Sequence, residues 1–374
     1  MSQLQKPSNG TETARNQHLS TVSNERIKHT ILVVDDEENN LQLLKRTLRR
    51  KYNIITATNG LEALKIVEEN GDNIALIISD QRMPQMTGTE FLSQISDKYP
   101  NIIKMLLTGY SDIDAMVEGV NKCQLFQYIS KPFDLDELQI IIKNGINAYE
   151  LTLSKQALLL DLRELFFTTI KSISSALDAK DAYTHGHSYR VTLYSLILSR
   201  ELIKDVKMLE DIEIAGLLHD IGKIAVPENI LCKPGKLTDE EYSTIKMHPS
   251  NGKRILNGIK KLKFISFWLS SHHERWDGRG YPQGVKGLEI PLPARILGVA
   301  DTYDAMTSNR SYRKGLSHEI AAQEIKNCSG SQFDPEVVAV FEKVEHIFKA
   351  AMEDPVSYYN DYSVLNKARG VKHE

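Results

Sequence analysis

Histidines gather in one part of the chain, at spacings that suit metal binding. The sequence has 11 histidines, and six of them lie between Tyr183 and Glu274: His185, His187, His219, His248, His272 and His273. Neutral imidazole is the commonest metal-binding side chain, and its mixture with carboxylate favours Fe, Mn, Co, Ni or Zn over metals that prefer thiolate. This stretch therefore predicts a transition-metal site.

The adjacent pair His219-Asp220 is the most informative part of this group. Lys223 follows at i+4 and i+3, so on a helix all three side chains can face one cavity. A compact site in the core of a helical bundle takes its ligands from several helices. The expected contributions from other helices are His248, His272, His273 and Asp301.

The remaining histidines have weaker arguments as ligands. His187 is interpreted as a peripheral or conditional ligand, and His185 is left outside the site because it is out of helical phase with His187. An isolated histidine is more often an ordinary surface or core residue than a ligand. That interpretation applies to His18, His29, His318, His346 and His373.

Carboxylates also cluster in the first half of the chain. Asp35 and Asp36 directly follow an expected strand, and Asp80 directly follows another. Three carboxylates at adjacent strand ends repel each other unless a hard divalent ion neutralises them, and Mg²⁺ with several retained waters suits such a site. Thr108 ends a later strand and Lys131 follows the last one, which completes a pocket for a phosphoryl group.

The elements that must position this acidic pocket form an alternating pattern. Short β-branched runs separated by amphipathic segments predict a five-stranded, doubly wound parallel sheet with buried strands. Ligands bind beyond the carboxyl ends of the strands in such sheets. The expected strands are Ile31–Val34, Ile54–Ala57, Ala75–Ser79, Ile103–Leu107 and Phe126–Ile129, and the expected helices lie near Asn39–Arg50, Leu61–Glu69, Gly88–Lys98 and Asp112–Asn121.

A single helix is expected to connect this domain to the rest of the chain. Residues 148–170 contain no turn signal, and Leu151, Leu158, Leu162 and Leu165 recur at helical spacing. A stripe as apolar as this one is most simply explained by burial against a partner. That partner is either the second domain or the same helix of another protomer in a homodimer, and the sequence leaves both open.

The second half of the chain is expected to be an all-α bundle. Residues 238–241 form a capping box, and Asp334-Pro335 provides a helix start, whereas no alternating pattern of useful length is found. We expect the bundle to occupy residues 171–349. Residues 350–374, with Tyr358, Tyr359 and Tyr362, are expected to form a loose extension, and residues 1–29 a disordered polar tail.

Composition limits the classes of function. The 374 residues suit about two domains, and the net charge of −3 gives no global attraction to nucleic acid or anionic lipid. No apolar run is long enough to cross a bilayer, no secretory signal is found, and three widely spaced cysteines suit a reducing cytoplasm. The absence of a basic recognition helix disfavours a DNA-binding regulator.

Residues 30–147 resemble a two-component receiver domain. The resemblance rests on the run Asp80-Gln81-Arg82-Met83-Pro84-Gln85-Met86-Thr87-Gly88 and on Lys131-Pro132-Phe133. It implies that Asp80 is phosphorylated by a sensor histidine kinase and that Asp35, Asp36 and Asp80 hold Mg²⁺. It also implies switch roles for Thr108, Tyr128 and Lys131.

Residues 168–349 resemble an HD-GYP domain of the HD phosphohydrolase superfamily. The supporting motifs are Gly186-His187-Ser188, the run His219-Asp220-Ile221-Gly222-Lys223, His248-Pro249, the run from His272 to Pro282, Asp301, and Arg310-Ser311-Tyr312-Arg313-Lys314. The resemblance implies hydrolysis of cyclic di-GMP. Some members with three metals carry a glutamate where this chain has Tyr183, so we expect two ions, Fe or Mn. We also expect hydrolysis to stop mainly at the linear dinucleotide pGpG and to proceed less efficiently to GMP.

These resemblances suggest a division of roles within the second domain. Two ions about 3.5–4 Å apart activate water for attack on a phosphodiester. Asp220 would bridge them, and Lys223 would stabilise phosphoryl charge or protonate the leaving oxygen. His219, Asp220 and Asp301 are assigned to one ion, and Asp220, His248, His272 and His273 to the other.

Substrate and partner contacts are less specific. Arg310, Arg313 and Lys314 are candidates for gripping the second phosphate, with simple solvation as the alternative. Tyr281 would touch the ligand or a signalling protein that binds the GYP region. We expect phosphorylation of Asp80 to alter the packing of the 148–170 helix and so change turnover. The alternatives are a non-catalytic module for cyclic di-GMP or protein binding, and a hydrolase of another cyclic dinucleotide.

Overall fold

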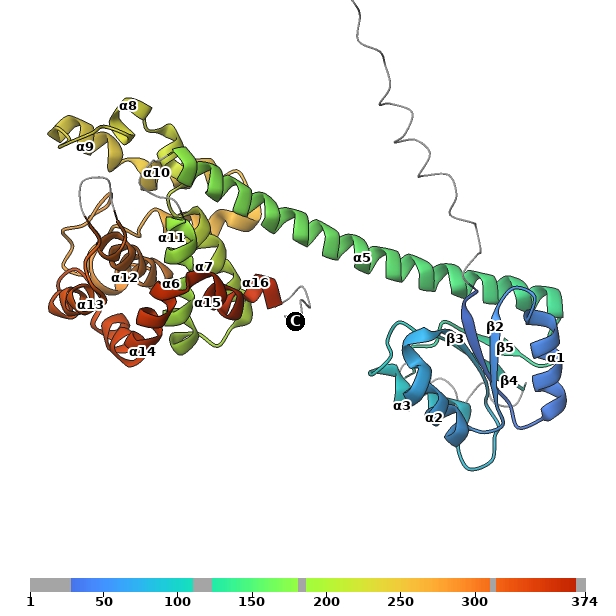
Figure 1. The fold of residues 1–374 in the computed structure, drawn as a ribbon. Coiled ribbons are helices and arrows are strands. Elements are labelled where there is room, and N and C mark those ends of the chain that lie inside the picture. The colour runs from blue at the N-terminus through green and yellow to red at the C-terminus, as the bar shows by residue number, and fades with distance from the viewer. Residues whose placement is uncertain (1–27, 110–122, 181–185, 310–313, 368–374) are drawn as a thin grey trace, which may run out of the picture. The chain divides into compact units, whose positions relative to one another are not determined.

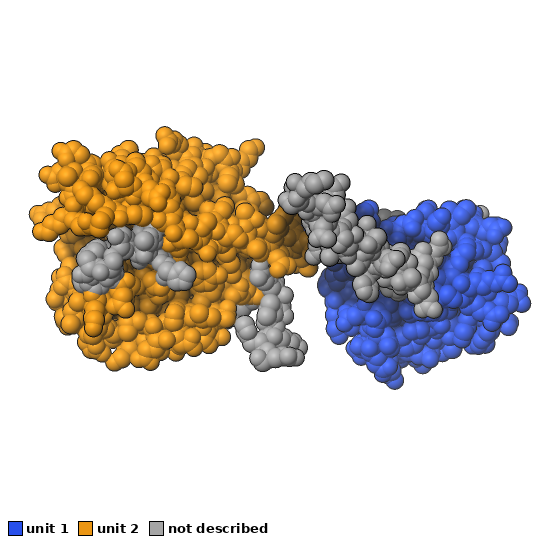
Figure 2. Space-filling view, turned by 45° about the horizontal axis from the view of Figure 1, so that its top comes forward, with its two compact units in different colours: residues 1–159 blue, residues 160–374 orange. Residues whose placement is uncertain are grey.

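The computed structural model describes residues 28–109, 123–180, 186–309 and 314–367 of the chain. It divides into two compact units, residues 1–159 and 160–374, which Figure 2 colours blue and orange. Each unit has its own hydrophobic core. Among the described helices, none is long and apolar enough to span a bilayer.

The first unit is built on a five-stranded parallel sheet with strand order β2-β1-β3-β4-β5, which confirms the expected fold class (Figure 1). Every residue of β3 is buried, as a strand covered on both faces requires. All five strands lie within one or two residues of their expected positions. Their bounds are β1 Thr30–Val34, β2 Asn53–Ala57, β3 Ile74–Asp80, β4 Ile103–Thr108 and β5 Gln127–Ser130.

Helices cover both faces of this sheet. Helix α1 (Glu38–Leu48) packs on one face together with the start of α5, whereas α2 (Gly60–Asn70) and α3 (Gly88–Ser96) pack on the other. The short 3-10 helix η1 (Gly71–Asn73) leads from α2 into β3. The helix expected near Asp112–Asn121 lies outside the described residues.

Helix α5 is longer than the connecting helix expected from the sequence. It runs without interruption from Leu135 to Lys180, so the last helix of the receiver-like unit and the connector are one element. Gly145 lies within this helix, and a Cβ atom there would lie 2.5 Å from Met105 Cε and 2.8 Å from Leu76 Cδ1. The glycine therefore lets the helix approach the sheet closely.

The leucine stripe of α5 is not covered by the described chain. Leu151, Leu158, Leu162 and Leu165 are 59–71% exposed. Pairing of the helix with a second protomer remains a proposal.

The second unit is an all-α bundle, as expected. Helix α6 lies at its centre, and α7, α12, α14 and α15 pack against it. Its N-terminal half comprises α6 His187–Leu202, α7 Val206–Leu218, η2 Ile221–Ala225, α8 Glu228–Leu231, α9 Asp239–Ile245, α10 His248–Leu256, η3 Lys260–Leu262 and α11 Lys263–Leu269. Its C-terminal half comprises η4 Gly287–Glu289, α12 Leu292–Thr307, α13 His318–Asn327, α14 Pro335–Glu353, α15 Pro355–Tyr362 and α16 Val364–Lys367. The capping box at Thr238 and the helix start at Asp334 are both present.

The expectation of a loose C-terminal extension is wrong for residues 350–367. Helix α14 continues to Glu353, and α15 and α16 fold onto the bundle. The reason is the fully buried Glu213 of α7, whose carboxylate must be hydrogen-bonded to offset its desolvation. It accepts hydrogen bonds from Tyr359 Oη (2.8 Å), Ser363 Oγ (2.5 Å) and the backbone N–H groups of Val364 (2.9 Å) and Leu365 (3.1 Å).

Candidate functional site

The expected metal ligands of the second unit lie mainly at the ends of helices. His187 is the first residue of α6 and His248 the first residue of α10. The pair His219-Asp220 does not lie inside a helix, as the sequence suggested, but at the junction where α7 ends and η2 begins. Gly222 makes this junction possible, because a Cβ atom there would lie 1.8 Å from the carbonyl oxygen of His248.

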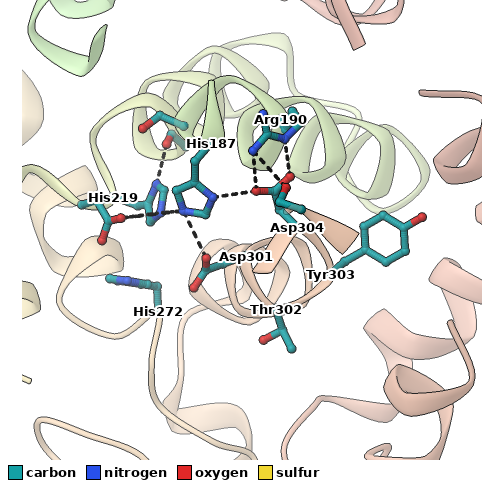
Figure 3. A network of polar contacts seen from close by, with 12 residues as sticks. His187, Arg190, His219, His272, Asp301, Thr302, Tyr303 and Asp304 are labelled. Carbon is teal, nitrogen blue, oxygen red and sulfur yellow. Dashed lines mark hydrogen bonds and ion pairs between the residues drawn. The ribbon is translucent and has the colours of Figure 1, made fainter. Parts of the chain in front are cut away.

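One group of ligand atoms comes from α6, α7 and α12. His187, His219 and Asp301 offer atoms that lie within 4.8 Å of one another. The Nε2 atom of His187 is 3.3 Å from Asp301 Oδ1 and 3.3 Å from His219 Nε2. Figure 3 shows these three side chains turned toward one another. His187 is therefore as central to this group as the other two residues, not peripheral to it.

A second group comes from the start of α10 and the turn after α11. His248, His272 and His273 also offer ligand atoms within 4.8 Å of one another. The Nε2 atoms of His248 and His272 approach to 3.4 Å. The structure thus gathers the imidazoles that the sequence assigned to one ion.

Asp220 lies between the two groups. Its Oδ2 atom is 3.5 Å from His219 Nε2 and 3.7 Å from His187 Nε2, while its Oδ1 atom is 3.3 Å from His248 Nε2. One oxygen thus faces each group, which is the arrangement a bridging carboxylate needs. The ammonium of Lys223 lies 2.6 Å from Asp220 Oδ2 and borders the same cavity.

The hydrogen bonds made by the Nδ1 atoms of the imidazoles set their tautomers. Nδ1–H of His219, His248 and His272 donates to the backbone carbonyl three residues earlier, at 2.6–2.8 Å. A proton on Nδ1 leaves the Nε2 lone pair free to bind a metal. His187 Nδ1 contacts Asp304 Oδ2 at 2.7 Å, and Arg190 Nε donates to Asp304 Oδ1 at 2.6 Å (Figure 3).

This donor set fits divalent metal ions. With both Nδ1 protons committed, the Nε2 lone pairs of His248 and His272 lie 3.4 Å apart and repel each other unless one cation binds both nitrogens. Burial holds the pKa of His272 well below its usual range and lowers the pKa of His273 to about 4. Both imidazoles are therefore neutral near pH 7, as ligands must be.

In the ligand group of His187 and at Asp220, neighbouring opposite charges stabilise the ionised side chains. Burial lowers the pKa of His187, but its hydrogen bonds to Asp301 and Asp304 outweigh this effect and raise the pKa to about 10. Burial also opposes ionisation of Asp220, yet Lys223 and His219 hold its pKa well below the usual range. The site therefore keeps its carboxylates ionised.

A cavity of about 360 Å³ opens onto these ligands. Lys223, Lys233 and Tyr281 border it together with His187, Asp220, His248, His273, Asp301 and Asp304. The Tyr281 ring stacks on His273 with 4.8 Å between ring centroids, which places the tyrosine beside the ligands. Of the proposed phosphate contacts, Arg310 and Arg313 lie outside the described residues, and Lys314 is exposed.

Sequence reasoning missed three side chains at this site. Asp304 lies one helical turn after Asp301 on α12, and that i, i+3 spacing was the available signal. Arg190 follows His187 at the same spacing on α6. Lys233 borders the cavity and pairs with Glu241 at 2.7 Å, a contact that no sequence pattern indicates.

The acidic pocket of the first unit lies at the carboxyl ends of β1 and β3. Asp35, Asp36 and Asp80 offer oxygens within 4.8 Å of one another, a set that suits Mg²⁺. Lys131 Nζ lies 2.6 Å from Asp80 and 3.2 Å from Asp35. Burial raises the pKa of Asp80 despite this ammonium.

The two switch candidates, Thr108 and Tyr128, lie on neighbouring strands. Thr108 is buried at the end of β4, and Tyr128 on β5 is 55% exposed. The structure therefore brings the threonine to the same sheet edge as Asp80 and Lys131. The tyrosine side chain faces solvent.

Comparison with known proteins matches both units. Residues 31–143 match the family described as the response regulator receiver domain, and residues 171–337 match the family described as the HD domain. A cyclic di-GMP phosphodiesterase of Thermotoga maritima is 34% identical over 340 residues, which cover 84% of this chain and 90% of that protein.

Two further relatives differ in coverage and name. The "Cyclic di-GMP phosphodiesterase response regulator RpfG" of Xanthomonas campestris is 29% identical over 82% of this chain and 85% of its own length. The "3'3'-cGAMP-specific phosphodiesterase 1" of Vibrio cholerae is 40% identical over 39% of this chain and 34% of its own length. The chain therefore belongs to the family of phosphodiesterase response regulators in which a receiver domain is joined to a metal-dependent HD domain.

Proposed function

We propose that this protein hydrolyses cyclic di-GMP to the linear dinucleotide pGpG and that phosphorylation of Asp80 controls the rate. The observation that carries the proposal is the position of Asp220, which presents one oxygen to each of two buried ligand groups. A pair of ions held in this way lowers the pKa of water and polarises phosphate oxygens. The family relatives named cyclic di-GMP phosphodiesterases support the choice of substrate.

The ligand groups suit Fe or Mn. His187, His219 and Asp301 would hold one ion, and His248, His272 and His273 the other, with Asp220 shared between them. Imidazole and carboxylate ligands without thiolate favour such metals. We propose two ions and not three, because the position where some relatives carry a glutamate is Tyr183 in this chain.

The remaining side chains would position the substrate. Lys223 Nζ points into the cavity beside Asp220 and can stabilise phosphoryl charge or give a proton to the leaving oxygen. Tyr281 offers an aromatic face at the cavity wall for a base or the ribose. Arg310, Arg313 and Lys314 are proposed to hold the second phosphate.

Control would begin in the receiver domain. A sensor histidine kinase is the proposed phosphodonor, and Asp35, Asp36 and Asp80 would hold the Mg²⁺ that phosphoryl transfer requires. Thr108 and Lys131 would then contact the phosphoryl group, with Tyr128 as the switch aromatic. The proposed location is the cytoplasm, which suits the three free cysteines.

Metal content and product formation should be measured on the same sample, purified without oxygen. We expect about two ions per chain in the HD domain and conversion of cyclic di-GMP to pGpG. Asp220→Ala should lose both metal and turnover. The matched control is Asp239→Asn, an exposed residue of α9 outside the cavity. Full activity of metal-replete Asp220→Ala would refute the site.

A second candidate substrate is another cyclic dinucleotide. The relative named 3'3'-cGAMP-specific phosphodiesterase 1 is 40% identical over 145 residues of this chain, which motivates the comparison. The ratio of kcat/KM values for cyclic di-GMP and 3'3'-cGAMP discriminates between the two substrates. Tight binding of cyclic di-GMP without turnover in a metal-loaded sample would instead indicate a non-catalytic module.

A further inference from the structure

One stretch of the second unit has no acidic residue. Between Glu241 and Glu274 the sequence contains six cations: Lys246, Lys253, Arg254, Lys260, Lys261 and Lys263. The whole chain carries 46 cations against 49 acidic residues, so this imbalance is local. A local excess of one sign creates a surface potential even when the net charge is small.

Five of these cations lie around the turn between α10 and α11, which is formed by η3. We refer to residues 253–267 as the basic corner. Arg254, Lys260, Lys261 and Lys263 are exposed, and Lys253 is half-buried. Within the described part of the chain, none of the five forms an ion pair with a carboxylate.

The basic corner also exposes large apolar side chains. Ile255, Ile259 and Phe267 are 40–46% exposed, and Phe264 is 77% exposed. Lys253 Nζ lies 4.8 Å from the centre of the Phe267 ring, so α10 and α11 present one continuous surface. The residues of α10, η3 and α11 that face the core are different ones, namely Leu256, Leu262, Ile265 and Leu269.

The composition of this surface discriminates between classes of partner. Protein interfaces are depleted in lysine, and four of these five cations are lysines. Protein surfaces that bind nucleic acid combine cations with aromatic or polar side chains. The exposed Ile255 and Ile259 match neither kind of contact. Lysines around exposed Phe and Ile are typical of segments that lie in the interface of a membrane containing anionic lipid.

We propose that the basic corner binds the surface of membranes rich in anionic lipid, with Phe264 inserted between the headgroups. The inference does not rest on the proposed phosphodiesterase activity. In the sequence, the basic corner lies between segments that carry candidate metal ligands, because His248 begins α10 and His272 and His273 follow α11. Figure 1 shows α10 and α11 within the second unit.

Vesicle co-sedimentation of the full-length chain tests this proposal. We expect stronger partitioning onto phosphatidylcholine vesicles that contain phosphatidylglycerol than onto phosphatidylcholine alone, and loss of the difference at high salt. Lys260→Gln with Lys261→Gln should weaken partitioning by about fivefold for each lysine removed. Phe264→Ser should weaken it by about tenfold without changing the net charge.

Matched controls separate a local effect from a general one. Lys45→Gln with Lys65→Gln removes two exposed charges from the first unit, and Leu288→Ser removes a side chain that is 78% exposed on η4. Both controls should partition like the wild type, and all variants should share its Tm. The proposal is overturned if the wild type does not bind anionic vesicles or if the controls lose binding equally. Weaker self-association or weaker oligonucleotide binding in the corner variants, without an effect on vesicles, would also overturn it.

Discussion

At the scale of single residues, the hydrogen-bond partner of each Nδ1 atom determines how well the Nε2 atom of the same imidazole can bind a metal. His219, His248 and His272 use backbone carbonyls of their own helices or turns for this purpose. His187 differs, because its Nδ1 partner is the buried carboxylate of Asp304. A carboxylate partner makes an imidazole a stronger ligand than a carbonyl does.

Asp304 should therefore control metal binding without touching the metal. Asp304→Asn keeps an oxygen that can accept from His187 Nδ1–H but removes the charge, and it replaces the ion pair between Asp304 and Arg190 with a neutral contact. We expect metal affinity in the group of His187, His219 and Asp301 to fall by roughly 10–100-fold. Titration of the protein with metal, with the number of bound ions per chain measured at each step, gives this change in affinity.

The control is Asp361→Asn, an exposed residue of α15. It should bind both ions as tightly as the wild type. If Asp304→Asn also retains two tightly bound ions, then the charge of Asp304 does not contribute to the affinity.

At the scale of elements, the sequence predicted what hydrophobic periodicity encodes and missed what depends on tertiary contact. The buried strands are predictable because β-branched runs such as Ile31–Val34 leave few alternatives. The full length of α5 was not predicted, because its first turns, from Leu135 onward, are held by their packing on the sheet next to Gly145, which is a tertiary contact. The position of His219-Asp220 at a junction likewise depends on the contact between Gly222 and His248.

The C-terminal segment illustrates the same limit. Nothing in Tyr359 or Ser363 alone predicts order, because their partner, Glu213, is about 150 residues away in sequence. The candidate ligands could be named from residue type and spacing, since several motifs agreed. Their division into two groups around Asp220, and the contact between His187 and Asp304, depend on tertiary structure that no spacing in the sequence encodes.

Glu213→Gln tests whether that buried carboxylate holds α15 and α16 in place. The amide keeps one acceptor oxygen but turns its NH₂ group toward hydrogen-bond donors, such as the N–H groups of Val364 and Leu365. We expect the free energy of unfolding of the second unit to fall by about 2–3 kcal/mol. Urea unfolding followed by circular dichroism measures it.

Glu342→Gln, at an exposed position of α14, is the matched control and should leave the unfolding curve unchanged. Faster proteolysis after residue 353 in Glu213→Gln alone would add a local readout. Equal stability of Glu213→Gln and wild type would show that the four hydrogen bonds contribute no net stability.

At the scale of the whole molecule, the exposed leucine stripe of α5 predicts self-association. Leu151, Leu158, Leu162 and Leu165 lie on one helix and are all more than half exposed. Pairing of this helix in two protomers would remove the stripe from water. We expect a dimer in sedimentation velocity experiments, and a monomer when Leu158→Lys and Leu162→Lys are combined.

Leu288→Lys, which places the same charge at an exposed leucine of η4, should remain dimeric. A wild type that sediments as a monomer at the concentrations used for the activity assay would exclude this dimer. A dimer that persists in the double variant would place the interface elsewhere.

Helix α5 is also the element through which the two units share structure. Its first turns contribute Leu138 and Ile142 to the sheet core that contains Ile129 of β5, directly before Ser130 and Lys131. Its last turns contribute Phe167 and Ile170 to the core of the bundle, which also contains Leu217 and Leu218 beside His219. A change in packing at one end can therefore be carried by the same helix to the other.

Phosphorylation of Asp80 should alter turnover through this helix. Lys131 already bonds Asp80, so a phosphoryl group there must change the contacts of Lys131 directly before α5 begins. We expect acetyl phosphate with Mg²⁺ to change kcat for cyclic di-GMP in the wild type and in the control Asp72→Asn, but not in Asp80→Asn. Coupling requires that the helix packs with different free energies in the two states, so hydrogen exchange along residues 135–180 should change in the same samples. Identical responses of wild type and Asp80→Asn would show that the receiver domain does not control turnover through this aspartate.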